Sequence, residues 1–156
     1  MMVIALASDH AGYDLRKSIA NYLREKNYGI LEFGAVDAKT PVSYVGAGQS
    51  ASAAVLSGEA KKAVVICGTG IGISMVCNKY KGIRCALCTN EYMARMSREH
   101  NDANVLALGG RIVGSSLAIS IVAAFLESHF EEGGRHQIRV SEIGEQESGV
   151  FYPGSK

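Results

Sequence analysis

The chain has 156 residues, of which 47% are hydrophobic and 20% are charged, and its formal net charge is +1. This length suits one domain, and the near-neutral charge gives no sign of binding to nucleic acid or to a membrane surface. The first residues form no basic leader, and no apolar run is long enough to span a membrane, so we expect a cytoplasmic protein.

Short apolar segments with the length and aliphatic content of buried β-strands alternate with segments of helical period. In residues 12–27, for example, Leu15, Ile19 and Leu23 share one helix face and charged residues fill the other. Such alternation predicts an α/β fold with a doubly wound, five-stranded parallel sheet and helices on both faces. The expected strands are residues 3–7, 29–34, 63–67, 84–88 and 104–109, and the other expected helices include residues 45–57, 91–101 and 116–130.

The chain has four cysteines, and we expect free thiols. Cys85 and Cys88 have the spacing of a C-x-x-C motif, but no second pair accompanies them. They also fall in an expected strand, where positions three apart point to opposite faces. We therefore expect no metal site.

Residues 67–72, "CGTGIG", place a thiol and a glycine-rich turn between a buried strand and a helix. Glycine lets the backbone come close to a ligand, and the first amides of a helix are unpaired donors in a positive field. Thiols beside helix N-termini ionise readily, so this turn suits both an anion and a general base. The alternative is that Cys67 is a small core residue that ends a strand.

Polar residues mark two other corners of the expected sheet. Asp9 and His10 follow the first strand, although Asp9 is also a good helix cap. His100 and Asn101 precede the last strand, where a solvated helix end is the alternative.

Three arginines, Arg111, Arg135 and Arg139, stand next to glycines or in a polar turn. Planar guanidinium groups suit phosphate oxygens, although most surface arginines are only solvated. If several of them converge on one corner, they would bind a phosphomonoester.

Four motifs together resemble those of the type B ribose-5-phosphate isomerases, within the wider group that includes galactose-6-phosphate isomerase subunits. They are "SDHAGYDLR", "VVICGTGIGISM", "CTNEYMARMSREHNDANVLALGGRIVG" and "FEEGGRHQIRV". The match runs in order from residue 1 to about residue 143. It implies a single isomerase domain over residues 1–143, a Rossmann-like α/β/α sandwich, and leaves residues 144–156 as a loosely ordered tail.

The resemblance implies interconversion of ribose 5-phosphate and ribulose 5-phosphate without a metal or cofactor. It also implies a homodimer with active sites at the subunit interface, and does not decide between a dimer and a tetramer. In this family pattern Cys67 is the base that moves a proton between C1 and C2, and Thr69 stabilises the enediolate. His100 opens the furanose ring, with Asn101 beside it, both from the partner subunit, and Asp9 binds sugar hydroxyls. The other implied contacts are backbone amides of Gly68, Gly70, Ile71 and Gly72 at the enediolate oxygen, and His10, Arg111, Arg135 and Arg139 at the phosphate.

One segment departs from the family pattern. In "TPVSYVGAG", with Tyr44 aligned to the family tyrosine, Ser43 stands where the family has aspartate and Val45 where it has proline. The segment lies near the sugar end of the family's pocket, so allose 6-phosphate and galactose 6-phosphate stay alternative substrates.

Two other classes of function are weaker alternatives. A phosphosugar-binding protein without turnover would not need the intact catalytic motif. Dinucleotide binding by the glycine-rich turn would need an acidic residue about 20 positions on, which falls near residues 89–91, beyond the next expected strand.

Overall fold

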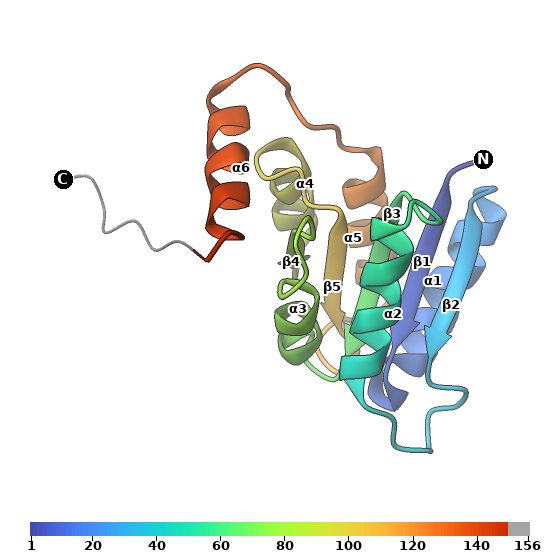
Figure 1. Ribbon diagram of the computed structural model, residues 1–156. Helices are drawn as coiled ribbons and strands as arrows, with labels where there is room; N and C mark the ends of the chain where they lie inside the picture. The colour runs from blue at the N-terminus through green and yellow to red at the C-terminus, as the bar shows by residue number, and fades with distance from the viewer. Residues whose placement is uncertain (150–156) are drawn as a thin grey trace.

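The computed structural model describes residues 1–149 and confirms the predicted α/β architecture. A five-stranded sheet in the order β2-β1-β3-β5-β4, with every neighbouring pair parallel, lies between layers of helices (Figure 1). Each crossover therefore returns the chain to the same edge of the sheet before the next strand begins. The strands are β1 (Val3–Ser8), β2 (Gly29–Gly34), β3 (Lys62–Cys67), β4 (Cys85–Leu87) and β5 (Val105–Gly109).

Helices cover both faces of this sheet. The 3-10 turn η1 (His10–Gly12) leads into α1 (Tyr13–Glu25), which packs on one face with α4 (Glu91–Glu99) and α5 (Ser115–Glu127). The other face carries α2 (Tyr44–Leu56) and α3 (Ile71–Cys77). Within residues 1–149, no helix combines the length and the apolar character that crossing a membrane requires.

A further helix, α6 (Arg135–Gln146), forms from the polar segment that follows α5 and stands apart from the sandwich (Figure 1). The sequence shows these residues only as a polar segment and does not predict this helix, none of whose residues is buried. It extends beyond residue 143, the expected end of the domain. Residues 150–156 of the expected tail lie outside the described residues.

The sheet separates two cores that differ in side-chain size. Large aliphatic residues of β1, β3 and β5 pack on one face, whereas alanines of the same strands and of α2 dominate the other. Burial on both faces is typical of parallel strands. The first core includes Ile4, Leu6, Val64, Ile66, Leu106, Leu108 and Phe125, and the second includes Ala5, Ala7, Ala47, Ala51, Ala63 and Ala107.

The four cysteines are free thiols, as predicted. Cys88 belongs to the first core and Cys85 packs against the second, so the two lie on opposite faces of the sheet. This placement confirms the strand interpretation of their C-x-x-C spacing.

A buried arginine ties α1 to the carboxyl ends of β1 and β2. Arg16 donates through Nη1 to the Phe33 carbonyl at 2.6 Å and to Ser8 Oγ at 3.1 Å, and through Nη2 to the Ala35 carbonyl at 2.7 Å. Its Nε lies 3.4 Å from Glu32 Oε2. One side chain thus satisfies two carbonyl groups where β2 ends, and holds the strand end beside the helix.

We expect Arg16→Met to lower the free energy of unfolding by about 2–4 kcal/mol, because the buried carbonyls and Glu32 lose their donor. Arg24→Met is the matched control. Arg24 contacts the same Glu32 at 2.6 Å but is half-exposed, so its loss should cost less than about 1 kcal/mol. Urea denaturation at one fixed protein concentration measures both. Equal losses would contradict the role given to Arg16.

Candidate active site

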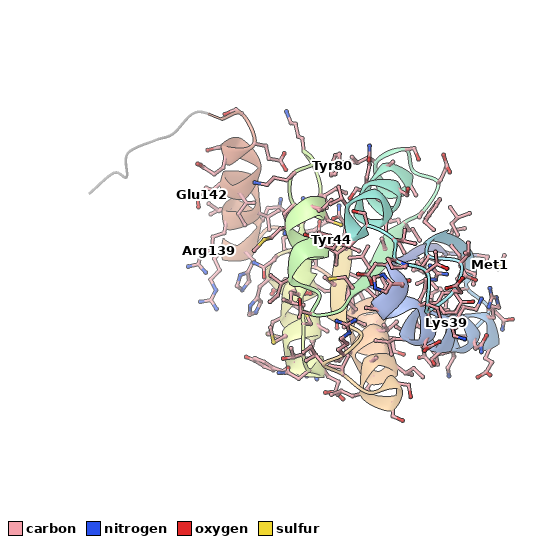
Figure 2. All side chains as sticks on the ribbon, turned by 90° about the horizontal axis from the view of Figure 1, so that it is seen from below. Met1, Lys39, Tyr44, Tyr80, Arg139 and Glu142 are labelled. Atoms are coloured by element: carbon pink, nitrogen blue, oxygen red, sulfur yellow. The ribbon has the colours of Figure 1, made fainter. Side chains whose placement is uncertain are left out.

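Three strand-to-helix connections are hydrogen-bonded to one another at the carboxyl edge of the sheet, which Figure 2 views from below. The Asp9 amide after β1 donates to the Ile66 carbonyl at 3.2 Å. After β5, the Gly110 amide donates to the Cys67 carbonyl at 2.8 Å and the Arg111 amide to the Gly68 carbonyl at 3.0 Å. The corners that carry Asp9, Cys67 and Arg111 therefore meet at one place, as expected for a parallel sheet.

Cys67 ends β3 and is 4% exposed, with its sulfur turned toward the glycine-rich loop. The Gly70 amide donates to Cys67 Sγ at 3.2 Å. Thr69 is exposed, and its Oγ1 accepts a hydrogen bond from the Ile71 amide at 3.3 Å. The thiol, a hydroxyl and the start of α3 are thus adjacent.

Gly70 has to be a glycine. Its φ is +79°, in the left-handed region that other residues rarely adopt. A Cβ atom there would lie 2.5 Å from Leu87 Cδ1 and 2.9 Å from the Leu108 carbonyl carbon. A larger residue therefore cannot adopt the conformation that directs the Gly70 amide toward Cys67.

Tyr44 lies against the first turn of α3. A Cβ atom on Gly72 would be 2.7 Å from Tyr44 Cζ, so the ring rests directly on the Gly72 backbone. Ser43 caps α2, because its Oγ accepts from the Val45 amide at 3.2 Å. Serine and aspartate are similarly good N-caps, so the departure at Ser43 preserves the start of α2 and with it the position of Tyr44.

The backbone amides of Asp9 and Arg111 bond the end of β3 and this loop, and His10 follows Asp9 in the chain. Asp9 is buried and its Oδ1 accepts from the Gly12 amide at 3.0 Å, so it does cap η1, as the alternative interpretation held. His10 Nδ1 accepts from the Val42 amide at 3.3 Å. The Arg111 side chain lies beside Gly68, since its Nη1 would be 3.5 Å from a Cβ atom there.

The remaining predicted residues form a second group, away from the carboxyl edge of the sheet. His100 is the C-cap of α4, which runs from the carboxyl end of β4 back to the amino end of β5. Its ring stacks on His136 of α6, with 4.0 Å between centroids and 9° between planes. Arg135 precedes His136, and Arg139 lies one turn further along α6, far from Tyr44 (Figure 2). Within one chain, these arginines lie with His100 and not with His10.

The second group is strongly cationic. Desolvation, together with the neighbouring charges of His100, Arg135 and Arg139, holds the pKa of His136 below its usual value. A neutral His136 can stack on the His100 ring without adding a further positive charge.

Residues 4–143 match the Ribose/Galactose Isomerase family. The chain belongs to this family. As a member, it is a sugar-phosphate isomerase, an intramolecular oxidoreductase.

Similar proteins cover nearly the whole chain. The solved structure of ribose-5-phosphate isomerase B from Clostridium thermocellum is 51% identical, has a TM-score of 0.91 and covers 95% of this chain and 99% of that chain. Ribose-5-phosphate isomerase B of Escherichia coli is 42% identical over 143 residues, which are 92% of this chain and 95% of that protein. D-erythrulose-4-phosphate isomerase of Pectobacterium atrosepticum is 35% identical over 144 residues, 92% of this chain and 94% of that protein.

Two residues that adjoin the predicted ones were not predicted from the sequence as site residues. Tyr44 stands in the segment that departs from the family pattern, but its contact with Gly72 joins residues far apart in the chain. His136 stands between Arg135 and Arg139, the two expected phosphate contacts of α6. Its polar side chain in that segment was the signal in the sequence that could have marked it as a site residue.

We expect Gly70→Ala to lower the free energy of unfolding by about 2–4 kcal/mol, because it adds left-handed strain and a clash with Leu87. Gly68→Ala is the matched control in the same loop. A Cβ atom on Gly68 meets nothing closer than 3.5 Å, so its unfolding free energy should stay within about 1 kcal/mol of wild type. Chemical denaturation compares the two, and equal stability would refute the requirement for glycine at position 70.

Proposed function

We propose that this isomerase interconverts ribose 5-phosphate and ribulose 5-phosphate through an enediolate, with Cys67 as the base. The observation that carries the proposal is the position of Cys67 Sγ, 3.2 Å from the Gly70 amide at the start of α3. The likeness to two ribose-5-phosphate isomerases B, at 51% and 42% identity, supports the choice of substrate.

The proposed reaction moves one hydrogen between neighbouring carbons. The Cys67 thiolate takes the proton from C2 of the open-chain aldose, the C1=O electrons move onto O1, and the thiol returns the proton to C1. The O2–H proton moves to O1, so atoms and charge balance. A base with a pKa near the working pH suits both halves of this exchange.

The glycine-rich loop is suited to the charge that develops on the sugar oxygens. The Gly70 amide lies 3.2 Å from the thiol, Thr69 is two residues from Cys67 in the chain, and the first amides of α3 lack partners within the helix. Donors held in place before the reaction stabilise an oxyanion without reorganisation, and one such donor is worth about 3 kcal/mol. The exposed side chain of Thr69 leaves this loop open to a substrate.

We further propose that a homodimer completes the site. His10 and Arg111 lie near Cys67, whereas His100, Arg135 and Arg139 lie at the other edge of the sheet. Two antiparallel copies would bring one group against the other, and the arginines would then hold the phosphate from both sides. Exposed apolar side chains on α3, α4 and the loop after β5 support an interface there. They are Ile71, Met75, Tyr92, Met93 and Ile112.

A second candidate keeps this chemistry on another sugar phosphate. Tyr44 and Ser43 stand at the glycine-rich loop, in the segment that departs from the family pattern, and a relative at 35% identity is named for a four-carbon sugar phosphate. Values of kcat/KM on ribose 5-phosphate, allose 6-phosphate and D-erythrulose 4-phosphate decide between the candidates. Better turnover of a substrate other than the pentose would overturn the proposed substrate and leave the mechanism in place.

Cys67→Ser should leave the fold intact and lower kcat about 100-fold or more, because a hydroxyl is a far weaker base than a thiolate. Cys85→Ser, on the edge strand, is the control and should keep wild-type turnover. Steady-state kinetics on ribose 5-phosphate, with circular dichroism to confirm folding, measure both. Unchanged turnover in Cys67→Ser would place the base elsewhere.

The shared site predicts complementation between inactive subunits. Co-expressed Cys67→Ser and Arg135→Ala/Arg139→Ala chains should recover roughly a quarter of wild-type activity, since half of randomly paired dimers regain one of their two sites. Cys67→Ser paired with Arg111→Ala is the control and should recover none, because both residues belong to the same half-site. Equal recovery in the two mixtures, or none in either, would contradict the shared site.

A further inference from the structure

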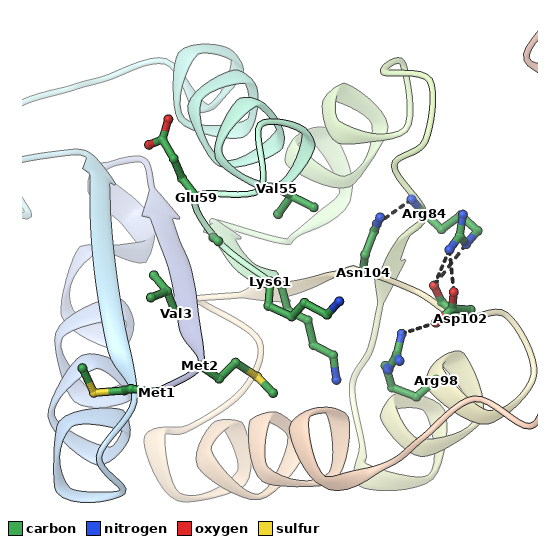
Figure 3. Close-up of a pocket in the computed structure, with 13 residues that line it drawn as sticks. Met1, Met2, Val3, Val55, Glu59, Lys61, Arg84, Arg98, Asp102 and Asn104 are labelled. Atoms are coloured by element: carbon green, nitrogen blue, oxygen red, sulfur yellow. Dashed lines mark hydrogen bonds and ion pairs between the residues drawn. The ribbon is translucent and has the colours of Figure 1, made fainter.

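A pocket of about 780 Å³ opens at the amino edge of the sheet, opposite the edge that carries Cys67 (Figure 3). Apolar side chains of Met1, Met2 and Val3 line one side, together with Val55 of α2. The other side carries charged residues from the first position of β3, the end of α4 and the loops before β4 and β5. The pocket thus has an apolar wall, beside which Glu59 also lies, and a wall that is mostly cationic.

Lys62, the first residue of β3, is buried in the cationic wall. It is 7% exposed, and no hydrogen bond or ion pair joins its Nζ to any other residue of 1–149. The Nζ atom lies 5.4 Å from the centre of the Phe125 ring, and Arg98 Cζ lies 5.8 Å from the same ring. The fold therefore holds two cations close to one aromatic side chain.

The charges around Lys62 do not balance within the described chain. Arg98 and Arg84 share one carboxylate, Asp102, at 2.8 and 2.9 Å (Figure 3). Arg98 Nε is buried and has no hydrogen-bond partner among residues 1–149. Desolvation and the Arg98 charge lower the pKa of Lys62 to about 8. Two positive charges are left over, and buried cations without a partner are costly.

We propose that this pocket binds a small organic phosphate, with its phosphoryl group at Lys62 and Arg98 and its apolar part against Met2, Val3 and Val55. A phosphomonoester near neutral pH carries close to two negative charges, which matches the excess of the cationic wall. The apolar wall favours an ester over the free anion, because it offers surface that inorganic phosphate cannot cover. The proposal is independent of the reaction at Cys67.

The methionines give a local readout of this binding. Of the five in the chain, Met1 and Met2 line the pocket, whereas Met75 and Met93 are exposed on α3 and α4. In protein labelled with 13C at the methionine methyl groups, phenyl phosphate should shift the Met2 resonance saturably, and Met2→Leu assigns that resonance. Inorganic phosphate should bind more weakly, and benzyl alcohol, which lacks the phosphoryl group, should leave the resonance unchanged at the same concentrations.

Lys62→Leu should weaken the phenyl phosphate response of Met2 at least tenfold, and it removes a buried charge without adding bulk. Lys79→Gln, an exposed lysine at the end of α3, is the matched control and should bind within twofold of wild type. The proposal is wrong if Met2 of the wild-type protein does not respond, if benzyl alcohol shifts it equally, or if folded Lys62→Leu binds as wild type does. Because no readout uses turnover, failure here is separate from failure of the proposed isomerisation.

Discussion

The candidate site depends on three backbone hydrogen bonds that continue the parallel pairing of the sheet into its loops. The amides of Asp9, Gly110 and Arg111 donate to carbonyls of residues 66–68, so the loops after β1 and β5 are attached to the end of β3. Without such bonds, backbone N–H and C=O groups at the end of a sheet must hydrogen-bond to water or to side chains. The corner that carries Cys67 is thus positioned by the same bonding that holds the strands together, and the side chains of Cys67 and Arg111 follow from where that backbone lies.

The topology that brings the corners of Cys67 and Arg111 together also keeps His100 away from them within one chain. In a parallel sheet every helix returns the chain to the opposite edge, so the end of α4 cannot lie near the end of β3 within one chain. His100 is therefore placed with α6, where it stacks on His136. The two edges differ in chemistry as a result: one presents backbone amides, a thiol and Arg111, and the other presents Arg135 and Arg139 on α6 and the cluster of Lys62, Arg98 and Arg84 around Asp102.

The sequence predicted the sheet well because β1, β3 and β5 are buried on both faces and read as continuous apolar runs. The least accurate strand was β4, which spans Cys85–Leu87 instead of residues 84–88, since it lies at the edge and Arg84 turns to bond the Asp102 region. The sequence also did not predict α6, which buries no side chain. The predicted corners at Asp9, Cys67 and Arg111 do meet, but the stacking of His100 on His136 and the contact of Tyr44 with Gly72 depend on tertiary structure that no local pattern encodes.

The alanine-rich core beneath α2 constrains how this enzyme can diverge. Alanines on the sheet and on the helix, with Gly48 facing α3, bring α2 so close to its neighbours that an added methyl group would meet Val76 and Ile73 at 3.1 and 3.3 Å. A helix held this tightly cannot slide to reshape a cavity. The exposed side chains at positions 43 and 45, by contrast, can vary without disturbing this packing. Ser43 occupies such a position and also caps the helix.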